Sequence, residues 1–393
     1  MIYLDNAATT SLAEEVVEAM QRFETMEYGN PSSTHQFGRA ARHAVEQARA
    51  DVAAWMGAQT DEVVFTSGGT ESINTALIGA FLMGQASGRK HFVTTAVEHH
   101  AVLHTCDFLR SLGASVTLVA PQADGRVRVQ DVVAAVRGDT VCVSVMSVNN
   151  ELGTIQPVRE LANAVKQVNA SILVHSDMVQ SGGAAGFGLA DSELDLASFS
   201  AHKLHGPKGV GALFIRRPVV FPSLLHGGEQ EKARRAGTEN VAGTVGFAAA
   251  ARRLTQNGRG HIKHLQEIRD LFWDQLKSMP DVILNSPMDA APSIVNVAFL
   301  GIKAETLLIR LDLAGVMASS GSACAAGSLE PSHVLLACGL EKNRIASSVR
   351  FSFSDFTTVE DAIQAGAIVR DTVQSLRMRA VTKDSLARLK HME

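Results

Sequence analysis

Between residues 60 and 216, short apolar runs alternate with runs of helical periodicity. The apolar runs, which we interpret as buried strands, lie at 63–66, 91–95, 115–119, 141–145, 172–174, 196–200 and 211–215. Helices are expected between them at 70–81, 101–112 and 158–168. Strands that alternate with helices indicate an α/β fold with a mainly parallel sheet flanked by helices. In such folds, ligands bind outside the carboxyl ends of the strands.

The chain of 393 residues is too long for one simple core, which predicts two domains. We expect a large domain over 13–257 and a smaller α/β domain formed by 1–12 and 258–393. The expected elements of the second part are a helix over 260–278, strands at 294–299 and 347–352, and helices near 304–313 and 358–377. A loop of small residues, which we expect to be mobile, spans about 317–334.

Charge and composition exclude several classes of protein. The net charge of −4 gives no reason to expect direct binding to nucleic acid or to an anionic membrane surface. No run approaches the roughly 20 apolar residues of a membrane span, and residues 1–5 do not resemble a signal peptide. The four cysteines are widely spaced and form no CxxC pair, so we expect a cytoplasmic protein without a disulfide framework or a metal site.

Lys203 is the first candidate for chemistry. It follows the apolar run 196–200, and His202 and His205 lie beside it. A lysine becomes nucleophilic toward a carbonyl cofactor when it is desolvated or next to other positive groups. The glycine-rich stretch 206–211 would bring the backbone close to a ligand. Taken alone, the same pattern also fits an ordinary surface lysine.

Other polar residues follow separate strands. Residues 66–71 (TSGGTE) join a strand to a helix and could hold a phosphate at the helix start, although Glu71 could also be a simple cap. Ser200 and His202 add donors there. Asp177 needs a cationic partner if it is buried, and Gln180 lies one helical turn further on.

Four further positions are candidates for chemistry. His99 and Asn150 also follow apolar runs, where such residues are often merely structural. Arg350 could bind a carboxylate with two hydrogen bonds or could pair with an acidic side chain. Cys324 has only Ala, Ser and Gly as near neighbours, which cannot cover a thiol, whereas Cys106, Cys142 and Cys338 fit buried apolar positions.

The order of these motifs resembles that of a known family, the cysteine desulfurases of the NifS/IscS type. The motifs that carry the resemblance are YLDNAATT (3–10), GNPSS (29–33), SGGTE (67–71), EH (98–99), VNNELG (148–153), DxxQ (177–180), SAHK (200–203), RAGTE (235–239) and SSGSAC (319–324). These enzymes belong to the class V aminotransferases of fold-type I and use pyridoxal 5′-phosphate. The resemblance covers the chain from Tyr3 to about Thr358.

The resemblance implies a role for each matching residue. Lys203 would bind the cofactor covalently, Asp177 would pair with its ring nitrogen, and His99 would stack on the ring and assist proton transfer. The other implied cofactor contacts are Gln180 to the phenolic oxygen, and Thr70, Ser200, His202 and the neighbouring subunit's Thr238 to the phosphate. Asn150 and Arg350 would bind the substrate carboxylate. Cys324 would be the nucleophile, on a loop of the long type.

The function implied is a homodimeric cysteine desulfurase that converts L-cysteine to L-alanine and leaves a persulfide on Cys324. The persulfide would pass to a sulfur-acceptor protein in iron–sulfur cluster assembly, tRNA thiolation or DNA phosphorothioation. A selenocysteine lyase, a class V aminotransferase and a non-enzymatic scaffold are the alternatives; the last two do not explain the cysteine loop or the intact Lys203, Asp177 and Cys324. The sequence departs from the family pattern at Met178, where alanine is usual, and at 226–230 (HGGEQ), where a third glycine is common.

Overall fold

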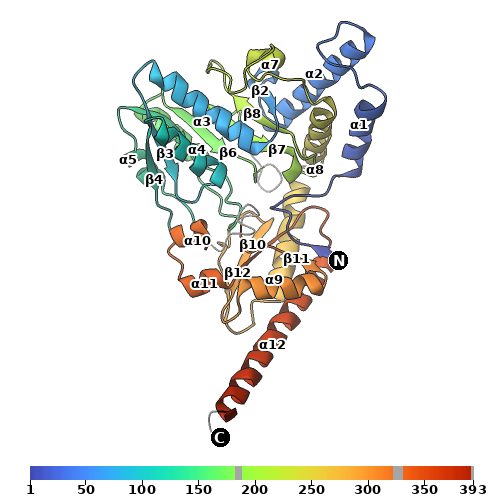
Figure 1. Cartoon of the computed structure of the whole chain (residues 1–393), viewed down its shortest axis with the longest axis vertical. Coiled ribbons are helices and arrows are strands. Elements are labelled where there is room, and N and C mark those ends of the chain that lie inside the picture. The colour runs from blue at the N-terminus through green and yellow to red at the C-terminus, as the bar shows by residue number, and fades with distance from the viewer. Residues whose placement is uncertain (182–187, 322–330, 391–393) are drawn as a thin grey trace.

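A seven-stranded sheet forms the centre of the larger part of the molecule (Figure 1). The computed structural model describes residues 1–181, 188–321 and 331–390, without the side chains of residues 259 and 380–390. In chain order the strands are β2 (Val63–Thr66), β3 (His91–Thr95), β4 (Ser115–Val119), β5 (Thr140–Ser144), β6 (Leu173–Asp177), β7 (Leu196–Ser200) and β8 (Gly211–Ile215). Their spatial order is β2-β8-β7-β6-β5-β3-β4. The predicted α/β architecture is therefore confirmed.

The sheet is parallel except for one strand. Strands β4, β3, β5, β6 and β7 pair in parallel, whereas β8 is antiparallel to both β7 and β2. Only ten residues connect β7 to β8, which is shorter than the dozen or more residues of a parallel crossover. Because β8 is reversed between them, β2 and β7 run in the same direction. Their carboxyl ends therefore lie at one edge of the sheet, together with those of β6, β5 and β3.

Helices cover both faces of this sheet. The helices of the chain are α1 (Glu14–Thr25), α2 (Gln36–Met56), α3 (Gly69–Gln85), α4 (His100–Ser111), α5 (Val129–Ala134), α6 (Val158–Val168), α7 (Gln230–Ala233), α8 (Val241–Asp274), α9 (Ala304–Leu313), α10 (His333–Ala337), α11 (Lys342–Ala346) and α12 (Val359–Lys390). One apolar cluster joins the sheet to α1, α2, α6 and α8, and another joins its opposite face to α3 and α4. Successive strand residues contribute to opposite clusters, as Val63 and Val64 do.

The smaller part of the molecule contains two short sheets. An antiparallel sheet has the order β12 (Ser348–Ser352), β10 (Ile294–Phe299), β9 (Val282–Leu284), and β1 (Ile2–Tyr3) pairs in parallel with β11 (Val316–Met317). These strands share an apolar cluster with α9, α12 and the second half of α8. Helix α8 belongs to both parts, and its backbone leaves the helical conformation at Gly258, where φ is 51°. The domain boundary expected at 257/258 stays a prediction.

Several predicted boundaries shift in the structure. The strand expected at 172–174 extends to Asp177, because Asp177 still pairs with Ser198 of β7; the strand expected at 141–145 spans 140–144. The helix expected over 260–278 is the second half of α8, which begins at Val241. The loop expected at 317–334 lies partly outside the described residues, and Cys324 is among those not described. Among described residues, no helix is both long and apolar enough to cross a membrane.

Gly211 provides a test of how the sheet supports the loop after β2. A Cβ at this position would lie 2.5 Å from the carbonyl oxygen of Phe199 and 2.7 Å from the Cα of Gly68. We expect Gly211→Ala to lower the free energy of unfolding by about 1–3 kcal/mol, because neither backbone can yield without distorting the sheet edge. Urea unfolding would measure the loss. The matched control is Gly138→Ala, since a Cβ there would meet no atom within 4 Å; equal stability of the two variants would contradict the prediction.

Candidate cofactor and substrate site

A cavity of about 180 Å³ lies where the carboxyl ends of β6 and β7 meet the start of α3. Most of the predicted site residues line it: Thr70, His99, Asn150, Asp177, Gln180, Ser200, His202, Lys203 and Arg350. All but Arg350 come from the larger part of the molecule. Arg350 comes from β12 of the smaller part, so the cavity is formed between the two parts.

Lys203 ends a short 3₁₀ turn (Ala201–Lys203) that follows β7 directly. Its Nζ donates hydrogen bonds to the backbone carbonyls of Ala7 and Ala8, the latter at 2.7 Å. Gln180 Nε2 also donates to the Ala7 carbonyl, at 2.9 Å. These two carbonyls are part of the site, yet reasoning from side-chain chemistry missed them. The one signal for them in the sequence is the motif at residues 3–10.

Asp177 ends β6 as a buried carboxylate. Its Oδ1 accepts a hydrogen bond from the backbone N–H of Val179 at 3.0 Å. Burial raises the pKa of Asp177 to about 6, against the opposing effects of the Val179 N–H and the nearby Lys203. A carboxyl group in this position gains from a second cation beside it, and a protonated pyridine nitrogen is such a cation.

His99 precedes α4 and caps its first turn. Its Nδ1 accepts a hydrogen bond from the backbone N–H of Ala101 at 3.1 Å, so the neutral ring carries its proton on Nε2. Burial lowers the pKa of His99 to about 4, and the charge of Lys203 adds to the effect. The side chain is therefore neutral near pH 7, with a proton to donate from Nε2.

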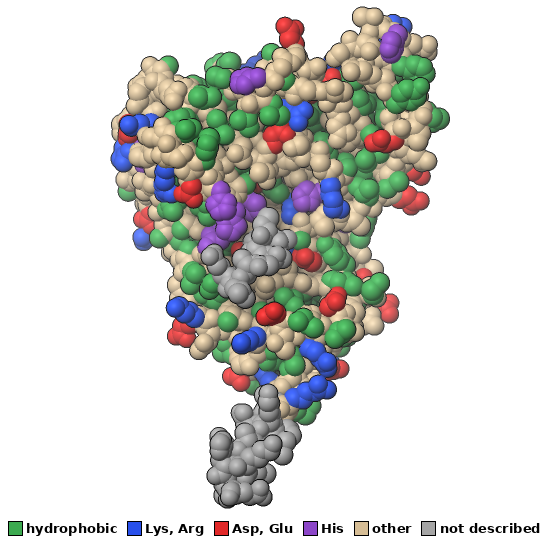
Figure 2. Space-filling model, in the orientation of Figure 1, with side chains coloured by type: hydrophobic (Ala, Val, Ile, Leu, Met, Phe, Trp, Pro, Cys, Tyr) green, Lys and Arg blue, Asp and Glu red, His purple; other side chains and the backbone are tan. Residues whose placement is uncertain are grey.

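Three more histidines lie next to His99. The ring of His100 lies 5.0 Å from that of His104 and 4.5 Å from that of His333, measured between centroids. Figure 2 shows histidine side chains gathered on this face of the molecule, at the level where its two parts meet. Protonation of any of them would further disfavour a charge on His99. Within the described ranges, no group of three His, Cys, Asp or Glu side chains is arranged as a metal site.

The start of α3 is open to an anion. Its N-cap residue is Gly68, which offers no side-chain acceptor to the N–H groups of the first turn. Thr70 lies in that turn, and Ser200 and His202 face the same cavity. Burial lowers the pKa of His202 to about 4. Glu71 accepts from the backbone N–H of Ser67 at 2.8 Å, as a capping carboxylate would, and also pairs with Arg235.

Arg350 lines the cavity and has a buried guanidinium group. Its Nη1 donates to the Asn150 carbonyl at 2.9 Å, and its Nη2 donates to Asp5 Oδ1 at 2.7 Å. Its Nε is buried and has no hydrogen-bond partner among the described residues. A buried unpaired donor is costly, so this edge of the guanidinium is suited to a carboxylate brought by a ligand. Sequence reasoning did not anticipate Asp5 as a partner of Arg350.

Two predicted site residues are not among the described residues that line this cavity. Thr238 lines a separate cavity of about 130 Å³, together with Ser67, Arg235 and Gly237. The structure of one chain therefore does not bring Thr238 to its own candidate phosphate site. Cys324 lies outside the described residues.

The cavity has the donor set that pyridoxal 5′-phosphate requires. It combines a lysine amine, a buried carboxylate for a ring nitrogen, an uncapped helix start for a phosphate and a histidine ring. The orphaned Nε of Arg350 adds a place for a substrate carboxylate. The residues present thus fit this cofactor and an α-amino acid.

Asp177 gives the cofactor-free protein a specific pH dependence. Its pKa is about 6 in the folded protein, against ~3.9 in an unfolded chain. Below about pH 4 both states hold the proton and no stability is lost; as the pH rises through 6, the folded state is destabilised by roughly 2–3 kcal/mol. Asp177→Asn removes this titration, so we expect the cofactor-free variant to be more stable than wild type at pH 8 by on the order of 2 kcal/mol.

Urea unfolding of both cofactor-free proteins between pH 4 and 8 would measure this difference, which should vanish near pH 4. The exposed Asp371 provides the control substitution, Asp371→Asn. A gain at pH 8 that persists unchanged at pH 4 would contradict the assignment of the effect to the Asp177 charge.

Comparison with known proteins places this site in a family. The model of the class-V aminotransferase family matches residues 2–364. A curated cysteine desulfurase IscS of Dictyoglomus turgidum is 44% identical over 378 residues, which are 96% of this chain and 95% of the relative. The solved structure of a NifS-like protein is 35% identical and has a TM-score of 0.89, covering 96% of this chain and 99% of its own.

A second solved structure, described as SspA in complex with cysteine, is 32% identical with a TM-score of 0.80 and covers 91% of this chain and all of its own. The family match extends over most of the chain, and the relative's identity of 44% is well above what fold similarity alone requires. The chain therefore belongs to the class-V aminotransferase family and, within it, to the pyridoxal-phosphate-dependent cysteine desulfurases.

Proposed function

We propose that this cysteine desulfurase takes L-cysteine as its substrate and transfers the sulfur to its own Cys324. The observation that carries the proposal is the combination, in one cavity, of Lys203, Asp177 and an Arg350 whose Nε has no hydrogen-bond partner among the described residues. SspA, a solved relative, is described in complex with cysteine, which supports the same substrate here.

Arg350 and Asn150 bind and orient the substrate carboxylate in this proposal. The Nε of Arg350, which has no hydrogen-bond partner among the described residues, would supply the donor, while Asp5 and the Asn150 carbonyl hold the guanidinium in place. Because Arg350 is almost fully buried, a carboxylate bound there is screened from water and interacts strongly with the guanidinium. The substrate amine would then lie within the cavity that Lys203 also lines.

Lys203, Asp177 and His99 act on the reacting end of the substrate. When bound, pyridoxal phosphate supplies an electron sink for the carbon next to the substrate amine. Asp177 would hold the ring nitrogen in its protonated form, and the Lys203 amine would accept and return the proton of the substrate carbon. His99 would hold the cofactor ring from the cavity wall and would donate a proton from Nε2.

Sulfur transfer involves Cys324 as nucleophile. Its thiolate attacks the substrate sulfur, so that an S–S bond forms on Cys324 while the C–S bond of cysteine breaks. The substrate carbon takes up a proton, alanine leaves, and the sum is L-cysteine plus a thiol giving L-alanine plus a persulfide. Only a few per cent of an ordinary thiol is ionised at neutral pH, so a base near Cys324 assists the attack.

The persulfide requires an acceptor protein and a reducing compartment. Passage to an iron–sulfur cluster, tRNA or DNA sulfur pathway begins from the same group, and we propose a protein acceptor in the cytoplasm, where a free thiol survives. We further propose that the enzyme is a homodimer. The position of Thr238 outside the cavity of its own chain supports a role in the neighbouring subunit's phosphate site.

Replacing Cys324 with Ser should separate substrate binding from sulfur transfer. Serine cannot store sulfur as a persulfide, whereas the residues lining the cofactor cavity remain unchanged. We expect Cys324→Ser to bind pyridoxal phosphate and to alter its absorbance when L-cysteine is added, yet to release no alanine and to carry no persulfide. Alanine assays and intact-protein mass spectrometry would measure both products.

Cys338→Ser is the control, because this thiol is buried and should not affect turnover. Alanine production by Cys324→Ser at the wild-type rate would make a lyase without a protein nucleophile the better assignment.

Mixed dimers would test whether Thr238 acts across subunits. When Lys203→Ala and Thr238→Ala subunits are paired, one site keeps its own Lys203 and receives an intact Thr238 from its neighbour. We expect such dimers, isolated with two different tags, to show about half of the wild-type activity per dimer. The control pairs wild type with the double variant Lys203→Ala/Thr238→Ala, which leaves the one lysine-containing site without Thr238.

The control dimer should be weaker by about tenfold or more, the scale of one lost hydrogen bond to a charged group. The opposite result, with the control dimer the more active of the two, would place Thr238 in the site of its own chain.

A further inference from the structure

Helix α7 (Gln230–Ala233) contains a left-handed turn built without glycine. The φ angles of Glu231, Lys232 and Ala233 are 49°, 57° and 62°. In this region the Cβ of an L-residue crowds the following carbonyl oxygen, so each of the three residues costs free energy. Such strain persists only where the surrounding structure holds it, and it concentrates at functional sites.

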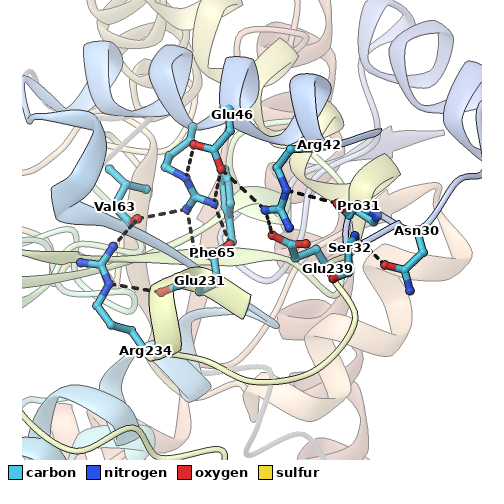
Figure 3. A network of polar contacts seen from close by, with 11 residues as sticks. Asn30, Pro31, Ser32, Arg42, Glu46, Val63, Phe65, Glu231, Arg234 and Glu239 are labelled. Atoms are coloured by element: carbon cyan, nitrogen blue, oxygen red, sulfur yellow. Dashed lines mark hydrogen bonds and ion pairs between the residues drawn. The ribbon is translucent and has the colours of Figure 1, made fainter. Parts of the chain in front are cut away.

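A buried ion pair holds the first residue of the turn. Arg49 of α2 donates to the Glu231 carboxylate through Nη1 at 2.6 Å and through Nη2 at 2.8 Å. The backbone N–H of Phe65 in β2 also donates to this carboxylate, at 3.0 Å. Both charged side chains are only 3% exposed, and the Arg49 guanidinium lies 5.0 Å above the Phe65 ring. The turn is therefore fastened to the sheet as well as to α2 (Figure 3).

A second ion pair from the same helix holds the far end of the segment. Arg42 Nη1 lies 2.7 Å from Glu239 Oε1, whose side chain is 4% exposed. Arg42 and Arg49 are seven residues apart, about two helical turns, and so project from the same face of α2. Figure 3 shows Arg42 beside Glu239, with Glu231 further along the same segment. The stretch from 231 to 239 is thus clamped at both ends.

The clamped segment contacts the candidate phosphate loop of its own chain. Arg235 donates to Glu71 through Nε at 2.9 Å and through Nη2 at 3.2 Å. Glu71 in turn accepts from the backbone N–H of Ser67, next to the uncapped start of α3. Three residues beyond Arg235 is Thr238, which we assign above to the phosphate of the neighbouring subunit. Segment 231–239 therefore contacts the candidate phosphate loop of its own chain through Arg235 and carries Thr238, which we assign to the phosphate site of the neighbouring subunit.

We propose that Glu231 is a positioning residue for both phosphate sites of the dimer. Its ion pair with Arg49 holds the left-handed turn, and the turn sets where Arg235 and Thr238 lie. This inference rests on the proposed dimer, in which Thr238 acts across subunits. A buried ion pair alone would be weak ground, because an apolar pair of similar volume often supports a fold equally well. Two further observations support the role of the Arg49–Glu231 pair: the strained backbone of the turn, and the contacts that lead from Arg235 through Glu71 to the backbone of Ser67.

The test uses two ligands that differ only in the phosphate. Cofactor-free protein is titrated with pyridoxal phosphate and with pyridoxal, and binding is followed by absorbance. We expect Glu231→Gln to weaken binding of pyridoxal phosphate by about tenfold or more, the scale of one displaced contact to a charged group, and to leave the affinity for pyridoxal within about twofold. Glu46→Gln is the matched control, since Glu46 also pairs with Arg49 but is 43% exposed and does not touch the turn.

A second variant relieves the backbone strain of the left-handed turn. Glycine adopts positive φ without crowding, so adding Lys232→Gly and Ala233→Gly to Glu231→Gln should restore most of the phosphate preference. If Glu231→Gln fails to fold because Arg49 is left as an unpaired buried charge, the pair is replaced by Arg49→Met/Glu231→Met. That variant should fold and bind pyridoxal normally, and should lose the preference for the phosphate.

The role of Glu231 would be overturned if the ratio of the affinities for pyridoxal phosphate and pyridoxal were unchanged in every folded Glu231 variant. The proposed function would still stand in that case, provided that the wild-type protein is a dimer and prefers the phosphorylated ligand. A wild-type protein that is monomeric, or that binds both ligands equally, would instead contradict the dimer and its phosphate sites, and the inference would fall with them.

Discussion

The common direction of β2, β5, β6 and β7 is the constraint on which the site depends. Because β8 is reversed between β2 and β7, all four of these strands end at the same edge of the sheet. Backbone hydrogen bonds fix these ends, so that Asp177, Ser200 and the loop after Thr66 face one cavity without needing to contact each other. Their carboxylate, hydroxyl and backbone donors can therefore serve a ligand.

The smaller part of the molecule closes this edge with one charged side chain. Arg350 is the middle residue of β12 and pairs with Asn296 of β10. Its side chain donates hydrogen bonds to Asp5 and to the carbonyl of Asn150, which lies in the larger part of the molecule. The N-terminal segment reaches the same place from another direction, with the Ala7 and Ala8 carbonyls on Lys203. The cavity thus depends on three stretches of chain that are far apart in sequence.

Elements could be predicted from the sequence where the local hydrophobic pattern matches the burial of the residues in the folded structure. The strands at 63–66, 91–95 and 211–215 are confirmed to the residue, and each is buried at every position. A charged side chain in or next to a buried strand is costly unless it has a partner. This cost made it possible to recognise three candidates from the sequence: Asp177, Lys203 and Arg350. Helices α1 and α2 were not identified, since their apolar stripes are interrupted by charged residues such as Arg49, which is buried only because Glu231 lies opposite. The carbonyls that hold Lys203 have no side-chain signature at all.

The N-terminal strand has a consequence for biosynthesis. Residues 2–3 pair with β11 at Val316, and Asn6 and Ala7 are bonded to Ser352, while the next residues hold Lys203. The ribosome makes these first residues at the start of translation, but their partners Val316 and Ser352 are made only after about eight and nine tenths of the 393-residue chain. The nascent large sheet can form early, because its contacts are closer in sequence. The cavity around Lys203, however, also includes Arg350 of β12, so it can be complete only when nearly the whole chain has been made.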